Sequence, residues 1–162
     1  DLEKNMDIQF TALATDLVEA LRNGAADANG QAPERDISDG SNIPCRHCLN
    51  EIEQGAPYLI LAHRPFPDLQ PYAELGPIFL HAEACRRHNP GDGRPEILIN
   101  RPTALIKGYQ DNDRIKYGAG RIVETKDMAA HAAEIFQDPD VTYIHVRSAL
   151  NNCYTCRIDR TR

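Results

Sequence analysis

Three cysteines and one histidine, arranged as two pairs, carry the clearest metal-binding chemistry in this sequence. Cys45 and Cys48 form a Cys-x-x-Cys motif, and further along the chain His81 and Cys85 lie four positions apart. Two thiols on one tight turn, with a His–Cys pair at the spacing of one helical turn, can supply the four nitrogen and sulfur ligands of tetrahedral zinc. These four residues are therefore our candidate zinc site.

The same residues fit two other roles. Free cysteine is among the most buried residue types, so Cys48 and Cys85 could be packed thiols, with His47 and His81 in ordinary hydrogen bonds. A redox or catalytic thiol is less favoured. A thioredoxin-type Cys-x-x-Cys motif lies in a βαβ unit, whereas this motif precedes a predicted hairpin. The residues alone do not decide between zinc and structural thiols.

The elements that must position these residues have the order of a treble-clef zinc finger. The motif at Cys45 is followed by predicted strands at 57–63 and 77–80, which we expect to pair as a hairpin. The segment 64–71 connects them as a loop, because repeated prolines exclude a central strand. A brief helix is expected at 82–87, within the second ligand pair. The His-x-x-x-Cys spacing departs from the His-x-x-Cys spacing more common in such fingers.

The remaining patterns predict an α+β protein with a mainly antiparallel sheet and two or three helices. Leucines at helical spacing before Asn23-Gly24 predict an N-terminal helix. Thr125 is expected to cap a helix with an apolar face between Met128 and Phe136. Strands and helices do not alternate regularly, so a parallel α/β sheet is not expected. Further strands are predicted at residues 8–10, 35–37, 103–109, 115–117, 121–123, 141–147 and 153–159.

The chain of 162 residues has the length of one domain, which we place at residues 7–162. A chain of this size buries roughly 68–70% of its unfolded surface, so any metal adds to a core that already exists. Residues 25–44 are rich in Asp, Asn, Gly, Pro and Ser and are interpreted as a surface excursion. Residues 1–6 are interpreted as a flexible terminus or an expression remnant.

The predicted C-terminal hairpin gathers a second set of reactive side chains. Residues three apart in a strand point to opposite faces, so Cys153 and Cys156 are not expected to form a metal pair, and Cys156 is assigned to the core. If the hairpin closes symmetrically, Arg147 lies opposite Cys153 and favours its thiolate. Cys153 is then a candidate nucleophile with His145 as its base. Alternatively, Arg147 and Arg157 hold a small anion, or the face is an ordinary solvated surface.

Composition limits the classes of partner and compartment. The chain has 18 basic and 24 acidic residues and a net charge of −6, which opposes nucleic-acid binding. Its apolar runs are too short to span a bilayer, and no signal-peptide pattern opens the sequence. Five cysteines, an odd number, favour reduced thiols or metal ligands over disulfides. We therefore expect a cytoplasmic protein without a membrane partner.

Several blocks of sequence occur in this order along the chain: Pro44–Leu49, Gly76–His81 with Cys85, Arg101–Tyr109, His145–Ala149 with Asn152-Cys153, and Arg157–Arg160. Together they resemble a known bacterial family, the domain of unknown function 1203. The resemblance implies a small cytosolic bacterial protein that forms one complete domain, and it brings no known activity. In that family a cysteine at the position of Cys45 is not always present. The resemblance therefore implies a second grouping, Cys48, His81, Cys85 and Cys153.

Two functional hypotheses follow from these residues. In the first, the protein is an accessory or binding domain in which zinc or a packed thiol cluster fixes the Cys45 motif. In the second, the polar face of the C-terminal hairpin acts as a thiol-dependent enzyme or binds a small anion. The residues do not decide whether the protein is an enzyme.

Overall fold

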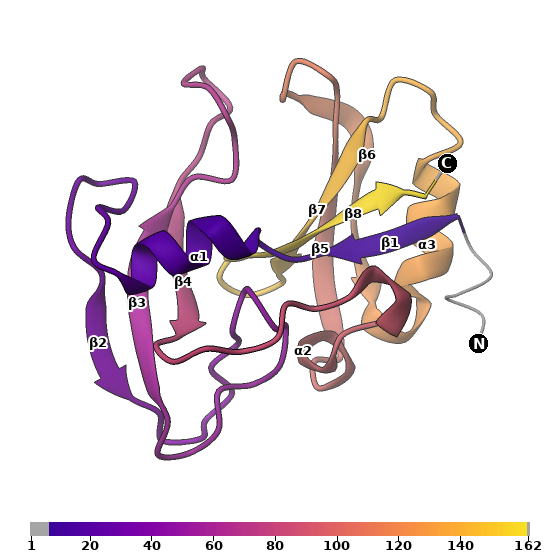
Figure 1. Cartoon of the computed structure of the whole chain (residues 1–162). Helices are drawn as coiled ribbons and strands as arrows, with labels where there is room; N and C mark the ends of the chain where they lie inside the picture. The colour runs from indigo at the N-terminus through magenta and orange to yellow at the C-terminus, as the bar shows by residue number, and fades with distance from the viewer. Residues whose placement is uncertain (1–6, 162) are drawn as a thin grey trace.

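Two antiparallel sheets lie side by side in the computed structural model, which describes residues 7–161 (Figure 1). The strands are β1 (Ile8–Thr11), β2 (Glu34–Ile37), β3 (Pro57–His63), β4 (Gly76–His81), β5 (Thr103–Tyr109), β6 (Ile115–Glu124), β7 (Tyr143–Ser148) and β8 (Tyr154–Arg160). The helices are α1 (Thr15–Arg22), α2 (Glu96–Ile99) and α3 (Met128–Ile135), with 3-10 turns η2 (Pro90–Asp92) and η3 (Thr125–Asp127). The predicted α+β class is confirmed.

The larger sheet has the strand order β1-β8-β7-β5-β6 and packs one face against α3. Alternation along the strands places Val146, Cys156 and Ile158 in the same apolar cluster as Met128 and other buried residues of α3. Cys156 is fully buried, as predicted. This packing leaves the other face of β5, β7 and β8 directed away from the α3 cluster.

The start of α3 differs from the prediction. Thr125 does not cap the helix, because the η3 turn comes first and Asp127 occupies the N-cap position. The Thr125 hydroxyl instead donates a hydrogen bond to the carbonyl oxygen of Arg101. The polar side chain thus joins η3 to the chain that precedes β5.

The smaller sheet has the order β2-β3-β4 and is covered by α1, which crosses in front of it in Figure 1. Val18 and Leu21 of α1 pack in one cluster with Leu59 and Leu80 of the sheet. The helix ends at Asn23, and Gly24 follows with a positive φ of 93° that favours glycine. The short strand predicted near 35–37 is confirmed as β2, which pairs with β3.

The helix predicted at 82–87 is wrong. Ala82 continues the ladder by donating its N–H to the carbonyl of Pro57, and the N–H of His88 donates to the carbonyl of His47. The backbone bonds of this segment therefore go to other parts of the chain. A helix confined to the few residues before Asn89-Pro90 would also be too short to be stable alone.

Two further predictions need correction in the larger sheet. Residues 115–117 and 121–123 belong to one strand, β6, which continues through Gly118 at a positive φ of 92°. In the β7–β8 hairpin, His145 pairs with Arg157 and Arg147 pairs with Tyr154, so the symmetric register is wrong. A bulge between Val146 and Arg147 shifts the pairing of Arg147 relative to that of His145.

Within residues 7–161, no helix is long and apolar enough to cross a membrane. The interpretation of residues 1–6 as a flexible terminus or remnant falls outside the described residues.

Candidate metal centre

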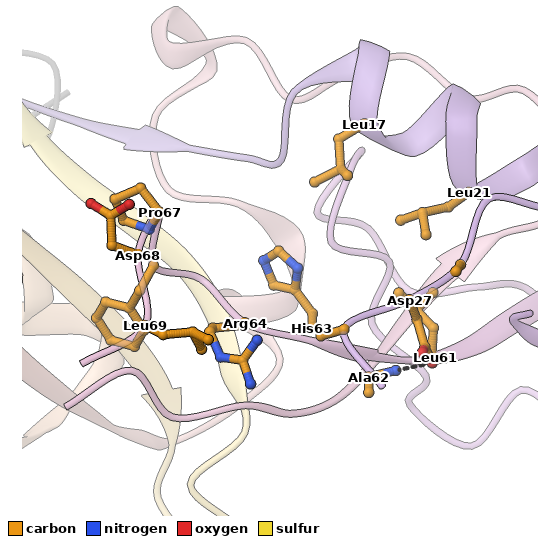
Figure 2. Close-up of a pocket in the computed structure, with 13 residues that line it drawn as sticks. Leu17, Leu21, Asp27, Leu61, Ala62, His63, Arg64, Pro67, Asp68 and Leu69 are labelled. Atoms are coloured by element: carbon orange, nitrogen blue, oxygen red, sulfur yellow. Dashed lines mark hydrogen bonds between the residues drawn. The ribbon is translucent and has the colours of Figure 1, made fainter. Parts of the chain in front are cut away.

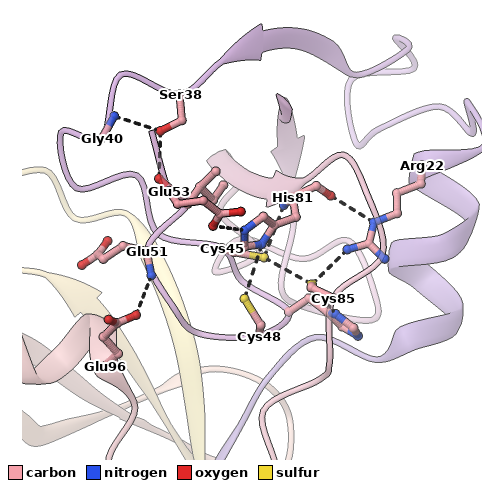
Figure 3. Close-up of polar contacts among 12 residues, drawn as sticks. Arg22, Ser38, Gly40, Cys45, Cys48, Glu51, Glu53, His81, Cys85 and Glu96 are labelled. Atoms are coloured by element: carbon pink, nitrogen blue, oxygen red, sulfur yellow. Dashed lines mark hydrogen bonds and ion pairs between the residues drawn. The ribbon is translucent and has the colours of Figure 1, made fainter. Parts of the chain in front are cut away.

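The Cys45-x-x-Cys48 turn meets the end of strand β4 at one compact cluster of ligand atoms. Cys45, Cys48, His81 and Cys85 offer ligand atoms that all lie within 4.8 Å of one another (Figure 3). His81 is the last residue of β4, and an isolated bridge from Cys45 to Phe79 ties the turn to that strand. The predicted grouping is therefore brought together, although Cys85 arrives on irregular chain and not on a helix. Within residues 7–161, the side chains close enough to share a metal ion are these four. Cys153 is not among them, so the alternative grouping with Cys153 in place of Cys45 is not formed.

The spacing of the atoms matches a tetrahedral metal site. Zn–S bonds of about 2.3 Å and Zn–N bonds of about 2.0 Å imply sulfur–sulfur separations of about 3.8 Å and sulfur–nitrogen separations of about 3.5 Å. The Sγ atoms of Cys45 and Cys85 lie 4.0 Å apart, and Cys48 Sγ lies 3.4 Å from Nδ1 of His81. All five cysteines are free, so disulfides do not explain the clustering. A metal ion fits this cluster with little rearrangement.

His81 is oriented by a carboxylate on its outer side. Its Nδ1 faces Cys48, while its Nε2 lies 3.0 Å from Oε2 of Glu53. A histidine that ligates metal commonly donates its other ring N–H to a carboxylate, which fixes the tautomer. The hydrogen bond to His81 also lowers the pKa of Glu53. Glu53 therefore leaves Nδ1 available for a metal.

Cys85 receives two polar contacts that the sequence analysis did not assign. Nη2 of Arg22, in the last turn of α1, donates to Cys85 Sγ at 3.1 Å, and Nδ1 of His47 lies 3.1 Å from the same sulfur. Arg22 also donates from Nε to the carbonyl of His81. Nε2 of His47 is in turn 2.9 Å from Oγ1 of Thr15. A guanidinium and an imidazole therefore hold the Cys85 sulfur in place from two sides.

The charges within the cluster are strongly coupled. Hydrogen bonds from the Cys48 and Cys85 thiols hold the pKa of Cys45 far below its usual value. The pKa of Cys48 is raised, and the main cause is its hydrogen bond with Cys45. Contacts with Cys45 and Cys85 raise the pKa of His81 to about 11. The cluster thus holds a thiolate beside protons that a metal ion would displace on binding.

An open pocket of about 420 Å³ adjoins the cluster. Cys48, His81 and Cys85 line its inner side, while Cys45 is 0% exposed behind them. The pocket gives a metal ion a route to its ligands. It is also lined by the carboxylates Glu51, Glu53, Asp92 and Glu96.

The structure places the residues of the C-terminal hairpin differently from the prediction. His145 and Arg147 are buried, so this face is not a solvated surface. Cys153 is not opposite Arg147; its Sγ lies 3.8 Å from the carbonyl oxygen of Asn151. Arg157 pairs with Asp159 at 2.7 Å. The predicted pairing of Arg147 with Cys153, on which the candidate nucleophile depended, is therefore not formed.

The sequence did not predict that Arg22 and Glu53 contact the cluster, and it predicted only ordinary hydrogen bonds for His47. His47 carried a usable signal, because it lies inside the Cys45–Cys48 motif. Glu53 follows that motif closely but has no spacing rule that marks it. Arg22 lies 63 positions before Cys85 and carries no local signal.

The fold and this cluster define an α+β protein with three cysteines and a histidine that could hold a metal ion. Residues 42–160, well over half of the chain, match the family described as "Protein of unknown function (DUF1203)". The chain therefore belongs to that family, which confirms the resemblance found in the sequence. No curated protein and no solved structure matches the chain.

Proposed function

We propose that Cys45, Cys48, His81 and Cys85 bind one zinc ion, which fixes the cysteine turn to the β3–β4 hairpin in an accessory or binding domain. The observation that carries the proposal is the grouping of four ligand atoms within 4.8 Å. Three sulfurs and one imidazole nitrogen suit zinc in tetrahedral geometry better than they suit hard cations such as magnesium or calcium.

A structural role is favoured over a catalytic one. Four protein ligands fill a tetrahedral zinc ion, whereas a catalytic zinc keeps one position for water or substrate. Cys45 is fully buried and accepts a hydrogen bond from the backbone N–H of His81 at 3.3 Å. Such a ligand is built into the fold, and its loss would loosen the turn.

The free cysteines support a reducing compartment, which for a bacterial protein is the cytoplasm. All five lack a disulfide partner. Disulfides persist in oxidising compartments, and reduced thiols are the rule in the cytosol. The alternative function, thiol chemistry with Cys153 as nucleophile and His145 as base, gains no support from the hairpin register.

Metal analysis of untagged protein purified without chelators tests the proposal. We expect close to one zinc per chain in the wild type and in Cys153→Ser, and strong loss in Cys85→Ser. Cobalt substitution should add the absorption bands of a tetrahedral thiolate site. Because Cys85→Ser could fail to fold, the wild-type stoichiometry is decisive by itself: less than about a tenth of an equivalent removes the zinc proposal, since structural zinc binds tightly.

A further inference from the structure

A second group of polar side chains lies on the face of the larger sheet that is turned away from α3. Lys107, His145 and Arg157 are direct neighbours across β5, β7 and β8. Tyr109 pairs with Tyr143 in the adjacent position, and their rings are stacked at 5.3 Å. This face therefore combines aromatic rings with positive charge.

The central part of this face, around His145, is buried beneath the loop between β3 and β4. Phe66 of that loop has its ring 5.1 Å from His145 and 5.3 Å from Tyr109. Tyr154 closes the other side, with its ring 4.9 Å from His145 and 5.8 Å from His63. His145 and Tyr109 are 0% exposed and Arg147 is 4% exposed.

Several polar atoms in this buried group have no hydrogen-bond partner in the structure. They are Nε2 of His145, the hydroxyl of Tyr109, Nε of Arg147 and Nε2 of His63. Buried polar atoms are nearly always paired, and each exception needs an explanation. Four exceptions on side chains joined by ring and hydrogen-bond contacts point to a group that is missing from the site.

The positive charges of this face are only partly paired with carboxylates. Lys107 pairs with Glu74 at 3.3 Å and Arg157 pairs with Asp159 at 2.7 Å. Arg147 has no carboxylate partner within the described chain; it donates to the carbonyl of Asn152 and contacts Nδ1 of His145 at 3.5 Å. Arginine keeps its charge in proteins, so Arg147 is a buried cation that lacks a counter-ion.

His145 does not compensate this charge. Burial lowers the pKa of His145 well below its usual value, and the charges of Arg147, Arg157 and Lys107 lower it further. The imidazole is therefore neutral at pH 7 and serves as a hydrogen-bonding group beside the cation.

We propose that this face binds the acidic group of a small organic anion, with Arg147 as counter-ion and the Tyr109 hydroxyl as a neutral donor. The shared chemistry is an oxyanion, either a carboxylate or a phosphate. A pocket of about 350 Å³ supplies room for the rest of the molecule (Figure 2). His63 and Phe66 line this pocket and also contact the buried group, so they lie between the two.

Apolar side chains form one part of the pocket wall, beside the charged side chains of Arg64 and Asp68, so an apolar body would lie against the leucines. Leu17 and Leu21 of α1 face it from one side and Leu69 from the loop, as Figure 2 shows. Asp27 also lines it, but its carboxylate accepts hydrogen bonds from the N–H groups of Asn29, Gln31 and Ala62. The negative charge of Asp27 is therefore held by the backbone.

Calorimetric titration of the zinc-loaded wild type with sodium phosphate, acetate and hexanoate tests the inference, with sodium chloride at equal ionic strength as reference. We expect at least one oxyanion to bind and hexanoate to bind more tightly than acetate. Phosphate binding with no carboxylate binding would assign the site to phosphate groups. Arg147→Met should weaken binding at least tenfold and Tyr109→Phe a few-fold. Arg35→Met, at an exposed position on β2, should change nothing.

Stability gives an independent readout. In buffer without oxyanions, Arg147→Met should unfold at the same temperature as the wild type or higher, because it removes an unpaired buried charge. The wild type should gain stability on adding the anion, and the variant should not. Failure of all three anions to bind the wild type overturns the inference, as does equal binding by wild type and Tyr109→Phe, the variant that keeps the ring. The zinc proposal is unaffected by either result, since the two sites share no residue.

Discussion

Oε2 of Glu53 lies 3.0 Å from Nε2 of His81, on the side of the imidazole opposite Cys48. The Glu53 side chain is 70% exposed and that of His81 is 12% exposed. The carboxylate therefore lies at the edge of the cluster, where it orients the His81 ring without occupying a ligand position.

Replacing Glu53 by Ala should weaken zinc binding by about tenfold, the lower end of the effect known for groups that orient a ligand, because Glu53 is well exposed. Competition against a chromophoric chelator measures the change. Glu53→Gln should lie between, since an amide oxygen still accepts the His81 N–H. Glu34→Ala, on exposed β2, is the matched control. An unchanged affinity in Glu53→Ala would show that packing alone orients His81.

Arg22→Met should make zinc-bound Cys85 more reactive. Arg22 donates a charge-assisted hydrogen bond to this sulfur, and its removal leaves more negative charge on the thiolate. We expect Cys85 to be alkylated several-fold faster in the zinc-loaded protein, with faster zinc release. Peptide mapping after timed iodoacetamide treatment identifies the residue.

Arg86 provides the control for the Arg22 variant. Arg86 adjoins Cys85 in sequence but is exposed and pairs with Asp92 at 3.2 Å. Arg86→Met removes the same charge without removing a bond to sulfur, so it should leave the alkylation rate unchanged. If Cys85 were alkylated at the same rate in Arg22→Met and Arg86→Met, general electrostatics would set its reactivity, and not the hydrogen bond from Arg22.

The grouping of Cys45, Cys48, His81 and Cys85 was predictable, because residue types and short spacings indicate which side chains could share a metal ion. The backbone conformation that brings Cys85 to His81 was not predictable. A spacing of four positions favours one helical turn between His81 and Cys85. In the structure, however, the backbone N–H groups of Ala82 and His88 donate to the carbonyls of Pro57 and His47. Long-range backbone partners of this kind leave no periodic signal in the segment itself.

The C-terminal hairpin shows a second limit. Alternation correctly placed Cys156 in the core and grouped His145 with Arg157 on the other face. The bulge after Val146 then changed the partner of Arg147 to Tyr154. A bulge depends on how the whole sheet twists, so the loop length alone did not fix the register. The burial of this face also depended on Phe66, which belongs to a distant loop.

Stability should fall as the pH is lowered from about 6.5 towards 4, in part because of His63. Burial and the positive charge of Arg46 lower the folded-state pKa of His63 to about 4, from an ordinary value of 6.5. Below pH 6.5 the unfolded chain binds a proton that the folded chain does not. This group therefore stabilises the fold above pH 6.5, and the contribution is lost on acidification, by at most about 1.4 kcal/mol per pH unit.

Urea denaturation of wild type and His63→Gln at several pH values measures this slope. The stability of His63→Gln should depend less steeply on pH than that of the wild type between about pH 4 and 6.5. Zinc release acts in both proteins and cancels in the comparison. The charge of His63 also lowers the pKa of His145, so the difference in slope includes this coupling. Parallel curves for the wild type and His63→Gln would refute the assignment.

Gly108 and Gly120 lie on paired strands of the larger sheet and should respond differently to alanine. A Cβ at Gly108 would lie 2.9 Å from Cβ of Ala119 and 3.2 Å from a methyl of Val141, both buried. Such overpacking costs about 1–3 kcal/mol, so Gly108→Ala should lower the free energy of unfolding by that amount. At Gly120 the nearest atom is the carbonyl oxygen of Ile106 at 3.7 Å, an ordinary contact. Gly120→Ala should therefore be neutral or add up to about 1 kcal/mol by restricting the unfolded chain. Urea denaturation of the two variants decides, and equal stabilities would show that the sheet at Gly108 adjusts without strain.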